Sequence, residues 1–149
     1  MSTKMTTLRM VGAAGLAAAA LAAVANASSP STVVTTAHTS LGTVLVTSAG
    51  KTLYLDTSDK PPKFACTGGC LKAWPPLKAV GTVKAAGSAK ASLLGTVKGP
   101  SGKTVTYNGH PLYTYSGDTK TGETTSQNLK LFGAKWYVVS VAGTAITKG

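Results

Sequence analysis

The sequence predicts a small all-β domain of short antiparallel strands, a sandwich or partly open barrel built from two repeat-related halves. Three observations predict it. The chain has 149 residues, which is enough for one domain. Its runs of Val, Thr, Leu and Tyr are short and are separated by Gly, Pro and Asn turns. One stretch of the chain also recurs further along. A coiled coil is excluded, because only 13% of the residues are charged and no heptads of Ala, Glu, Lys, Leu and Arg occur.

The first 27 residues predict a signal peptide. Lys4 and Arg9 form a basic start, Val11–Ala25 is uncharged and mostly apolar, and Ala25-Asn26-Ala27 is a small-x-small cleavage site. The apolar stretch is shorter than the roughly 20 residues that a membrane-spanning helix needs. We therefore expect export to the cell envelope or the medium, cleavage after Ala27 and no transmembrane anchor after cleavage. The alternative is an uncleaved anchor.

Short β-favouring runs follow the signal peptide. The expected strands are, in order, Val33–Thr39, Thr43–Thr47, Thr52–Asp56, Val80–Val83, Gly95–Lys98, Thr104–Tyr107, Leu112–Tyr115 and Trp136–Val141. The second and third strands are expected to form a hairpin, and the last is expected to pair with Thr144–Thr147. Asn108-Gly109 favours a type I′ turn, which requires two positive φ angles. Ser88–Leu94 predicts one or two helical turns, and polar Thr119–Lys130 predicts a mobile loop.

Two stretches of sequence recur within the chain. Leu41-Gly-Thr-Val44 recurs as Leu94-Gly-Thr-Val97, and Gly50–Asp59 aligns with Gly109–Asp118 through shared Gly, Leu, Tyr and Asp. Two units are too few for an open solenoid, but they can cover each other's apolar faces. The expected organisation is a signal peptide (1–27), a lead-in with the first strand (28–40), and a two-repeat β domain (41–149) made of repeat 1 (about 41–93) and repeat 2 (about 94–149).

Several motifs follow one another along the mature chain. They are Tyr54–Asp59 and Tyr113–Asp118, which share a Tyr and an Asp five residues apart, Cys66–Cys70 followed by Trp74-Pro75-Pro76, Tyr107–Tyr113, and Trp136–Ser140. Together they resemble the bacterial family called "secreted repeat of unknown function", predicted lipoproteins with a Y-x-(F/W/Y)-x-x-D motif. The resemblance implies a secreted or surface-attached protein and implies no activity. This chain lacks a cysteine for lipidation at the cleavage point and has Asp56 at one aromatic position.

The two cysteines are expected to form a disulfide, because an exported chain with only two cysteines most simply pairs them. Cys66 and Cys70 close a loop of five residues, for which the loss of chain entropy contributes only about 2 kcal/mol. We interpret the bond as a local structural clip and expect no cofactor. The alternatives are a reducible, redox-active disulfide and a weak metal site that also uses His110.

The aromatic and acidic motif residues are the other candidate site. They are Tyr54, Asp59, Trp74, Tyr107, Tyr113, Tyr115, Asp118 and Trp136. Each Asp follows its strand at a turn, so Tyr–Asp hydrogen bonds closing repeat-equivalent corners are expected. The alternative is that Asp59 and Asp118 meet near a pseudo-twofold axis and bind a cation or a basic ligand. Trp74 is expected to plug the β-core, with an exposed platform for a sugar ring or a partner as the alternative.

The mature chain is strongly basic. Of 15 basic residues, Lys4 and Arg9 precede the cleavage site, which leaves 13 lysines against 4 acids and a net charge of +9. Nucleic acid is not expected as a partner, because arginine is absent and the lysines are scattered from Lys51 to Lys148. The plain alternative is a solvated surface that keeps the protein soluble.

These features favour a secreted, non-enzymatic envelope protein that binds through its Tyr, Trp and Lys side chains. The expected partner is an anionic cell-wall polymer or an envelope protein. The alternative is an extracytoplasmic redox or metal-handling protein that uses Cys66 and Cys70. No G-x-S-x-G motif supports a hydrolase.

Overall fold

The computed structural model describes residues 12–149, and its regular structure is almost entirely β-strand. The strands are β1 (Ser31–Thr39), β2 (Gly42–Thr47), β3 (Tyr54–Asp56), β4 (Thr82–Ala85), β5 (Leu94–Gly99), β6 (Gly102–Tyr107), β7 (His110–Pro111), β8 (Leu129–Leu131) and β9 (Ala134–Val138). Within residues 12–149 the helical elements are a single turn, α1 (Cys70–Ala73), and a 3₁₀ turn at Ala91–Leu93. The all-β prediction is confirmed, and the 3₁₀ turn lies inside the segment expected to be helical.

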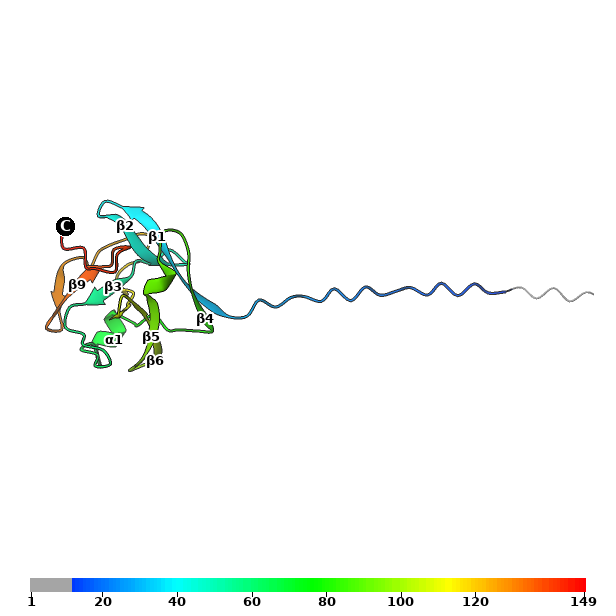
Figure 1. Ribbon diagram of the computed structural model, residues 1–149, viewed down its shortest axis with the longest axis horizontal. Helices are drawn as coiled ribbons and strands as arrows, with labels where there is room; N and C mark the ends of the chain where they lie inside the picture. The colour runs from blue at the N-terminus through cyan, green and yellow to red at the C-terminus, as the bar shows by residue number, and fades with distance from the viewer. Residues whose placement is uncertain (1–11) are drawn as a thin grey trace, which may run out of the picture.

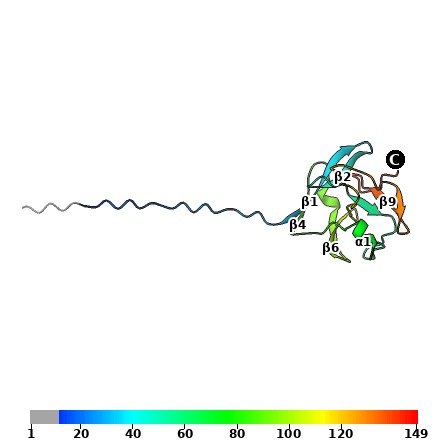
Figure 2. The same ribbon diagram turned by 180° about the vertical axis from the view of Figure 1, so that it is seen from behind.

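The strands form three small sheets. Their orders are β2-β1-β4, β3-β9-β8 and β5-β6-β7. All strand pairs are antiparallel except β1 with β4, which run parallel. In Figures 1 and 2 the β1–β2 hairpin and the tip of the β5–β6 hairpin lie on opposite sides of the domain. None of the three sheets of residues 12–149 closes into a barrel.

The two hairpins are repeat equivalents. β1 and β2 turn between Thr39 and Gly42, and β5 and β6 turn between Gly99 and Gly102. Gly42 and Gly102 have φ angles of 107° and 110°, a region that glycine enters without steric cost. The same turn is therefore built twice, sixty residues apart in the numbering.

This equivalence corrects one of the sequence matches. Leu41 lies in the turn that precedes β2, whereas Leu94 begins β5, which is the counterpart of β1. The similarity of Leu41–Val44 to Leu94–Val97 therefore does not give the repeat register. The match of Gly50–Asp59 with Gly109–Asp118 does, because Tyr54 and Tyr113 pair with each other.

Each half contains a closed triangle of backbone hydrogen bonds. In the first, Leu45 N–H donates to Val139 O (3.0 Å), Val139 N–H to Leu53 O (3.2 Å), and Leu53 N–H to Leu45 O (3.0 Å). The second triangle is made by Val105 N–H to Leu77 O (2.8 Å), Leu77 N–H to Leu112 O (2.8 Å), and Leu112 N–H to Val105 O (3.0 Å). Val139 comes from the second half of the sequence, and Leu77 from the first. The halves therefore exchange one segment each, and neither can keep its triangle without the other.

Two buried clusters make up the core. The first holds both tryptophans, Tyr54, Tyr113 and the two cysteines. The second contains five of the six triangle residues, and Leu77, the sixth, packs against it. Its buried members are Val34, Leu45, Leu53, Leu55, Val105, Tyr107, Leu112 and Val139. Burial of these apolar side chains is the main force that holds the exchanged segments in place.

Three local predictions need adjustment. The strand expected at Leu112–Tyr115 is not formed: the two-residue β7 ends at Pro111, and the chain then leaves β6 so that Tyr113 makes an isolated bridge with Tyr54 of the other half. The strand expected at Val80–Val83 begins at Thr82. The hairpin of the second and third strands is short: Val46 bridges Thr52, after which β3 pairs with β9.

Two turn and loop predictions have different outcomes. The type I′ turn is confirmed, because Asn108 and Gly109 have φ angles of 50° and 79° and Tyr107 pairs with His110. Thr119–Lys130 is not the free loop that its polarity predicts: Ser126 within it is fully buried, and the segment runs into β8.

Residues 12–30 carry no regular secondary structure and extend away from the domain (Figure 1). Lys4 and Arg9, the expected basic start, lie outside the described residues. No helix within residues 12–149 is both long and apolar enough to cross a membrane.

Candidate functional site

The residues of the Tyr–Asp motif meet at the junction of the two halves. Tyr54 N–H donates to Tyr113 O (2.8 Å), and Tyr113 N–H donates to Tyr54 O (3.0 Å), so the two tyrosines form one reciprocal backbone pair. Beside it the rings of Trp74 and Trp136 stack, with centroids 4.3 Å apart and planes 3° apart. Both pairs join one residue from each half, which marks a pseudo-twofold axis through this point.

Each tyrosine reaches across to the aspartate of the other half. The Tyr54 hydroxyl donates to Asp118 Oδ2 at 2.7 Å, and the Tyr113 hydroxyl donates to Asp59 Oδ2 at 2.7 Å. The Tyr–Asp hydrogen bonds expected from the sequence are present, but they cross between the repeats. They do not close a corner within each repeat. Each Y-x-(F/W/Y)-x-x-D motif therefore supplies the tyrosine of one crossing bond and the aspartate of the other.

The second oxygen of each aspartate holds its own loop. Asp59 Oδ1 accepts a hydrogen bond from Ala65 N–H at 2.7 Å, and Asp118 Oδ1 accepts one from Thr125 N–H at 3.1 Å. The Thr125 hydroxyl also donates to Asp118 Oδ1. Each carboxylate therefore links three parts of the chain: its own strand end, its own loop and the opposite tyrosine.

Burial controls the charges at this junction. Burial, together with the bonded carboxylates, raises the pKa of both Tyr54 and Tyr113, so both hydroxyls remain protonated donors. Burial also raises the pKa of Asp59, against the lowering effect of its Tyr113 and backbone bonds. These aspartates serve as hydrogen-bond acceptors for neutral groups. The two carboxylates do not face each other as a shared pair: Asp59 is bonded to Tyr113 and Asp118 to Tyr54.

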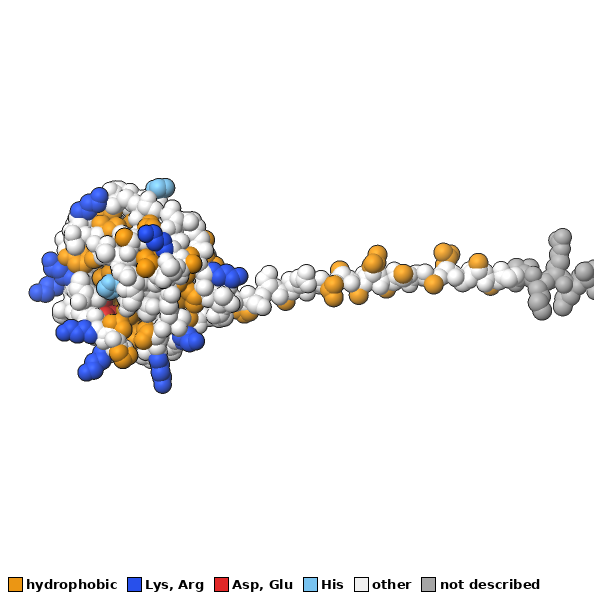
Figure 3. All heavy atoms as spheres, viewed as in Figure 1, with side chains coloured by type: hydrophobic (Ala, Val, Ile, Leu, Met, Phe, Trp, Pro, Cys, Tyr) orange, Lys and Arg blue, Asp and Glu red, His pale blue; other side chains and the backbone are white. Residues whose placement is uncertain are grey.

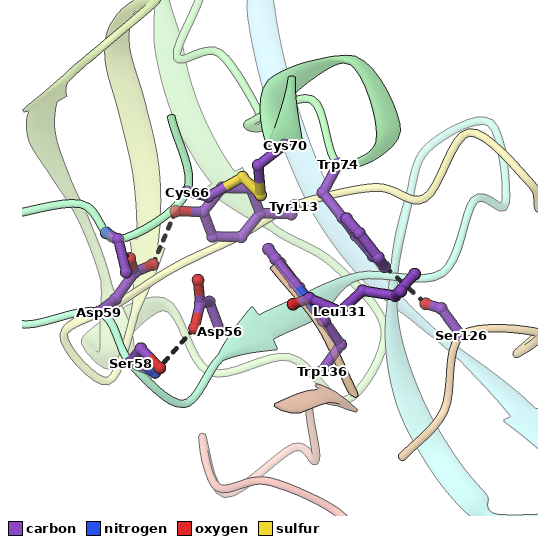
Figure 4. The surroundings of a disulfide bond; sticks show 11 residues. Asp56, Ser58, Asp59, Cys66, Cys70, Trp74, Tyr113, Ser126, Leu131 and Trp136 are labelled. Atoms are coloured by element: carbon purple, nitrogen blue, oxygen red, sulfur yellow. Dashed lines mark hydrogen bonds between the residues drawn. A yellow bond between two sulfur atoms is a disulfide. The ribbon is translucent and has the colours of Figure 1, made fainter. Parts of the chain in front are cut away.

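The aromatic position of the motif differs between the halves. Tyr115 stacks on Trp74, with centroids 4.9 Å apart and planes at 27°, and meets Tyr54 edge-on at 6.4 Å. At the equivalent position stands Asp56, which is only 3% exposed and whose burial raises its pKa to about 6. Asp56 Oδ1 accepts the Ser58 N–H at 2.7 Å (Figure 4). In the sequence, Asp56 is distinguished only by standing where the motif has an aromatic residue.

Cys66 and Cys70 form the predicted disulfide, with Cα atoms 5.3 Å apart. The two residues are 1% and 3% exposed, and the bond lies above the Tyr113 ring (Figure 4). In this disulfide the two sulfurs are bonded to each other and are not thiolates, the form in which cysteine binds a metal. Within residues 12–149 no three His, Cys, Asp or Glu side chains gather as a ligand set, and His110 joins none.

The prediction that Trp74 plugs the core is confirmed, and the exposed platform is wrong. Trp74 is 0% exposed, and its indole Nε1–H donates to Ser126 Oγ at 3.4 Å. Tyr107 is the one candidate that lies elsewhere: its hydroxyl donates to Val141 O at 2.7 Å, and its ring belongs to the second core cluster. The other candidates meet at the junction.

The charged surface is almost entirely basic. All thirteen lysines of the mature chain are exposed, namely Lys51, Lys60, Lys63, Lys72, Lys78, Lys84, Lys90, Lys98, Lys103, Lys120, Lys130, Lys135 and Lys148. Asp56 and Asp118 are buried, and Asp59 and Glu123 are partly buried. Figure 3 shows lysine side chains projecting around the outline of this face, not gathered in one patch.

The fold and the junction define a class: a two-repeat all-β protein whose halves exchange backbone segments and a Tyr–Asp pair around stacked tryptophans. The family described as "secreted repeat of unknown function" matches the chain at residues 35–78 and 95–140, which is more than half of its length. The chain belongs to this family of secreted repeats. The first matched segment holds Tyr54, Asp59 and Trp74 of the junction, and the second holds Tyr113, Tyr115, Asp118 and Trp136. No match was found among curated proteins or among solved structures.

Proposed function

We propose that this secreted repeat protein acts by binding, without turnover, to anionic polymers of the bacterial cell envelope. The observation that carries the proposal is the separation of charges: thirteen exposed lysines stand against four acids, none of which is fully exposed. A polyanion that approaches therefore meets many cations and few competing carboxylates, because only Asp59 and Glu123 are partly exposed. This separation favours long-range attraction to phosphodiester or carboxylate chains.

The part expected to make contact is the lysine surface alone. The candidate tyrosines and tryptophans are buried, apart from the partly buried Tyr115, so they are not available as a broad recognition face. Their role in this proposal is to hold a rigid scaffold. Because the lysines are dispersed, binding is expected to depend on total charge and not on one pocket.

The test is co-sedimentation of the mature protein with intact bacterial cell wall across a salt series. Raising the salt from 0.15 M to 1 M shortens the screening length from about 8 Å to about 3 Å, so bound protein is expected to be released. Walls stripped of their anionic polymers are expected to retain little protein even at low salt. Retention that is insensitive to salt, or equal on stripped walls, would overturn the proposal.

Two matched variants separate dispersed binding from a local site. One replaces Lys60, Lys63 and Lys72 with Gln, and the other replaces Lys84, Lys90 and Lys98 with Gln. Both remove three exposed charges from different parts of the fold. Similar losses of retention support binding through total charge, whereas a loss confined to one variant contradicts it.

A further inference from the structure

We propose that the aromatic core is a one-electron oxidation relay that accepts an oxidising equivalent from a soluble, radical-class oxidant and stores it on a tyrosine. The proposal is independent of surface binding. The relay consists of five rings, in order of contact Tyr54, Tyr115, Trp74, Trp136 and Tyr113. Tyrosine and tryptophan are the aromatic side chains that lose an electron most readily. Each ring of the relay forms an aromatic pair with the next.

The rings are close enough for an electron vacancy to move between neighbours. Trp74 lies 4.9 Å from Tyr115 and 4.3 Å from Trp136, both in stacked geometry. Trp136 meets Tyr113 edge-on at 5.1 Å. Tyr115 is only partly buried, whereas the other four rings are fully buried. The oxidant therefore reaches the relay at Tyr115, and the buried rings protect the product from solvent.

Proton acceptors decide where the vacancy rests. A tyrosine that loses an electron also loses its hydroxyl proton, so it needs a base within hydrogen-bond reach. The Tyr113 hydroxyl has Asp59 Oδ2 at 2.7 Å. The indole N–H groups of Trp74 and Trp136 have only a hydroxyl and a carbonyl, both at 3.4 Å. The tryptophans therefore only pass the vacancy on. Of the two tyrosines with a bonded carboxylate, Tyr113 contacts a tryptophan directly at 5.1 Å, whereas Tyr54 contacts only Tyr115, at 6.4 Å, so Tyr113 is where a vacancy on the tryptophans comes to rest.

Oxidation of Tyr113 couples the loss of one electron to the loss of one proton. The oxidant takes one electron from Tyr115, and its own oxidation state falls by one. The electron vacancy then moves along the rings to Tyr113. The O–H bond of Tyr113 breaks, its proton goes to Asp59, and a neutral tyrosyl radical and a carboxylic acid remain. Burial raises the pKa of Asp59, which makes it a better proton acceptor than an exposed aspartate. Tyr54 with Asp118 is the equivalent pair at the other end.

The test uses the secreted protein with photogenerated ruthenium(III) tris-bipyridine as the one-electron oxidant. Transient absorption is expected to show a tryptophanyl radical that converts to a tyrosyl radical, confirmed by electron paramagnetic resonance. Asp59→Asn is expected to slow this conversion by about a hundredfold, the usual contribution of a positioned proton acceptor. Tyr113→Phe is expected to lengthen the life of the tryptophanyl radical.

Tyr107→Phe is the matched control. It removes a buried tyrosine outside the relay whose hydroxyl donates to a backbone carbonyl, and it is expected to leave the conversion unchanged. In the wild type, heavy water is expected to slow the conversion, a measurement that needs no variant to fold. The proposal fails if the wild type forms no tyrosyl radical or shows no isotope effect, or if Tyr107→Phe changes the kinetics as Tyr113→Phe does.

Discussion

Two loops of the molecule connect a motif aspartate to the tryptophan that follows it, one in each half. In the first half the loop from Asp59 to Trp74 contains the disulfide and α1. In the second half the loop from Asp118 to Trp136 contains no cysteine and is held by hydrogen bonds, among them those of Thr125. Both loops deliver a tryptophan to the same stack. The shared frame therefore consists of Tyr, Asp and Trp, and the means of closing the loop varies.

A second difference lies on the strand side of the same frame. Tyr115 covers Trp74 with an aromatic ring, whereas the equivalent Asp56 places a buried carboxyl near the disulfide. An aromatic ring adds packing at any pH, but a buried carboxyl stabilises or destabilises according to its protonation. The two halves thus have the same architecture and different responses to conditions.

The largest expected effect tests the shared frame. Trp74→Ala and Trp136→Ala are each expected to lower the free energy of unfolding by about 3–5 kcal/mol, the usual cost of truncating a buried tryptophan. Trp74→Ala is expected to cost more, because Trp74 also stacks on Tyr115. Urea unfolding of both single variants and of the double variant measures this. The double variant is expected to lose less than the sum, because the two rings contact each other; strict additivity would contradict the shared stack.

The next test concerns the crossing hydrogen bonds. Tyr54→Phe and Tyr113→Phe each remove a donor to a carboxylate and are expected to cost about 1.5–3 kcal/mol. Tyr54→Phe is expected to cost more, since Asp118 is buried and Asp59 is only partly buried. The measurement is again urea unfolding, with Tyr137→Phe as a control on a partly buried tyrosine outside the relay. Equal values for Tyr54→Phe and Tyr137→Phe would show that the crossing bonds contribute nothing.

Sequence reasoning predicted the features that depend on neighbouring residues. Two positive φ angles follow from Asn108-Gly109, and the pairing of Cys66 with Cys70 follows from having two cysteines in an exported chain. Each of these two signals lies within a few residues of its consequence. The Tyr and Asp of the motif predicted the type of hydrogen bond but not its partner, because each bond crosses to the other repeat.

The sequence did not predict how the halves are combined. Nothing in the local pattern says that Tyr54 bonds the distant Asp118, or that Leu77 and Val139 complete the triangle of the opposite half. Such exchanges depend on how the two halves pack together in three dimensions. A repeat within one sequence does not say whether a residue bonds to its own half or to the other. Burial of Trp74 was open for the same reason, because its neighbours Ser126 and Trp136 come from the other half.

The disulfide tests the difference between the loops. Replacing Cys66 and Cys70 with Ala is expected to lower the free energy of unfolding by about 2 kcal/mol. This is the stabilisation that a five-residue ring provides by reducing the chain entropy of the unfolded state. The reaction of native protein with a thiol reductant is expected to be slow without denaturant, since the residues are 1% and 3% exposed. A free-thiol assay with and without denaturant measures this. Rapid reduction of the native protein would contradict a structural clip and favour a redox role.

The smallest expected effect concerns Asp56. Because its folded pKa is raised to about 6, the folded state binds a proton more tightly than the unfolded state does. Its contribution to stability is therefore greatest below the unfolded value of about 3.9 and is lost as the pH rises through 6. Between pH 5 and pH 7 the loss is expected to be about 1 kcal/mol, measured as a fall in the melting temperature.

Asp56→Asn is the variant that isolates this effect. Asparagine keeps an oxygen for the Ser58 N–H and does not titrate, so the fall in melting temperature between pH 5 and pH 7 is expected to shrink. A remainder is expected from Asp59, whose pKa burial also raises. Tyr115→Phe is the matched change at the equivalent position of the second half, and it is expected to leave the pH dependence intact. If Asp56→Asn and Tyr115→Phe have the same pH dependence, the buried carboxyl is not what distinguishes the two halves.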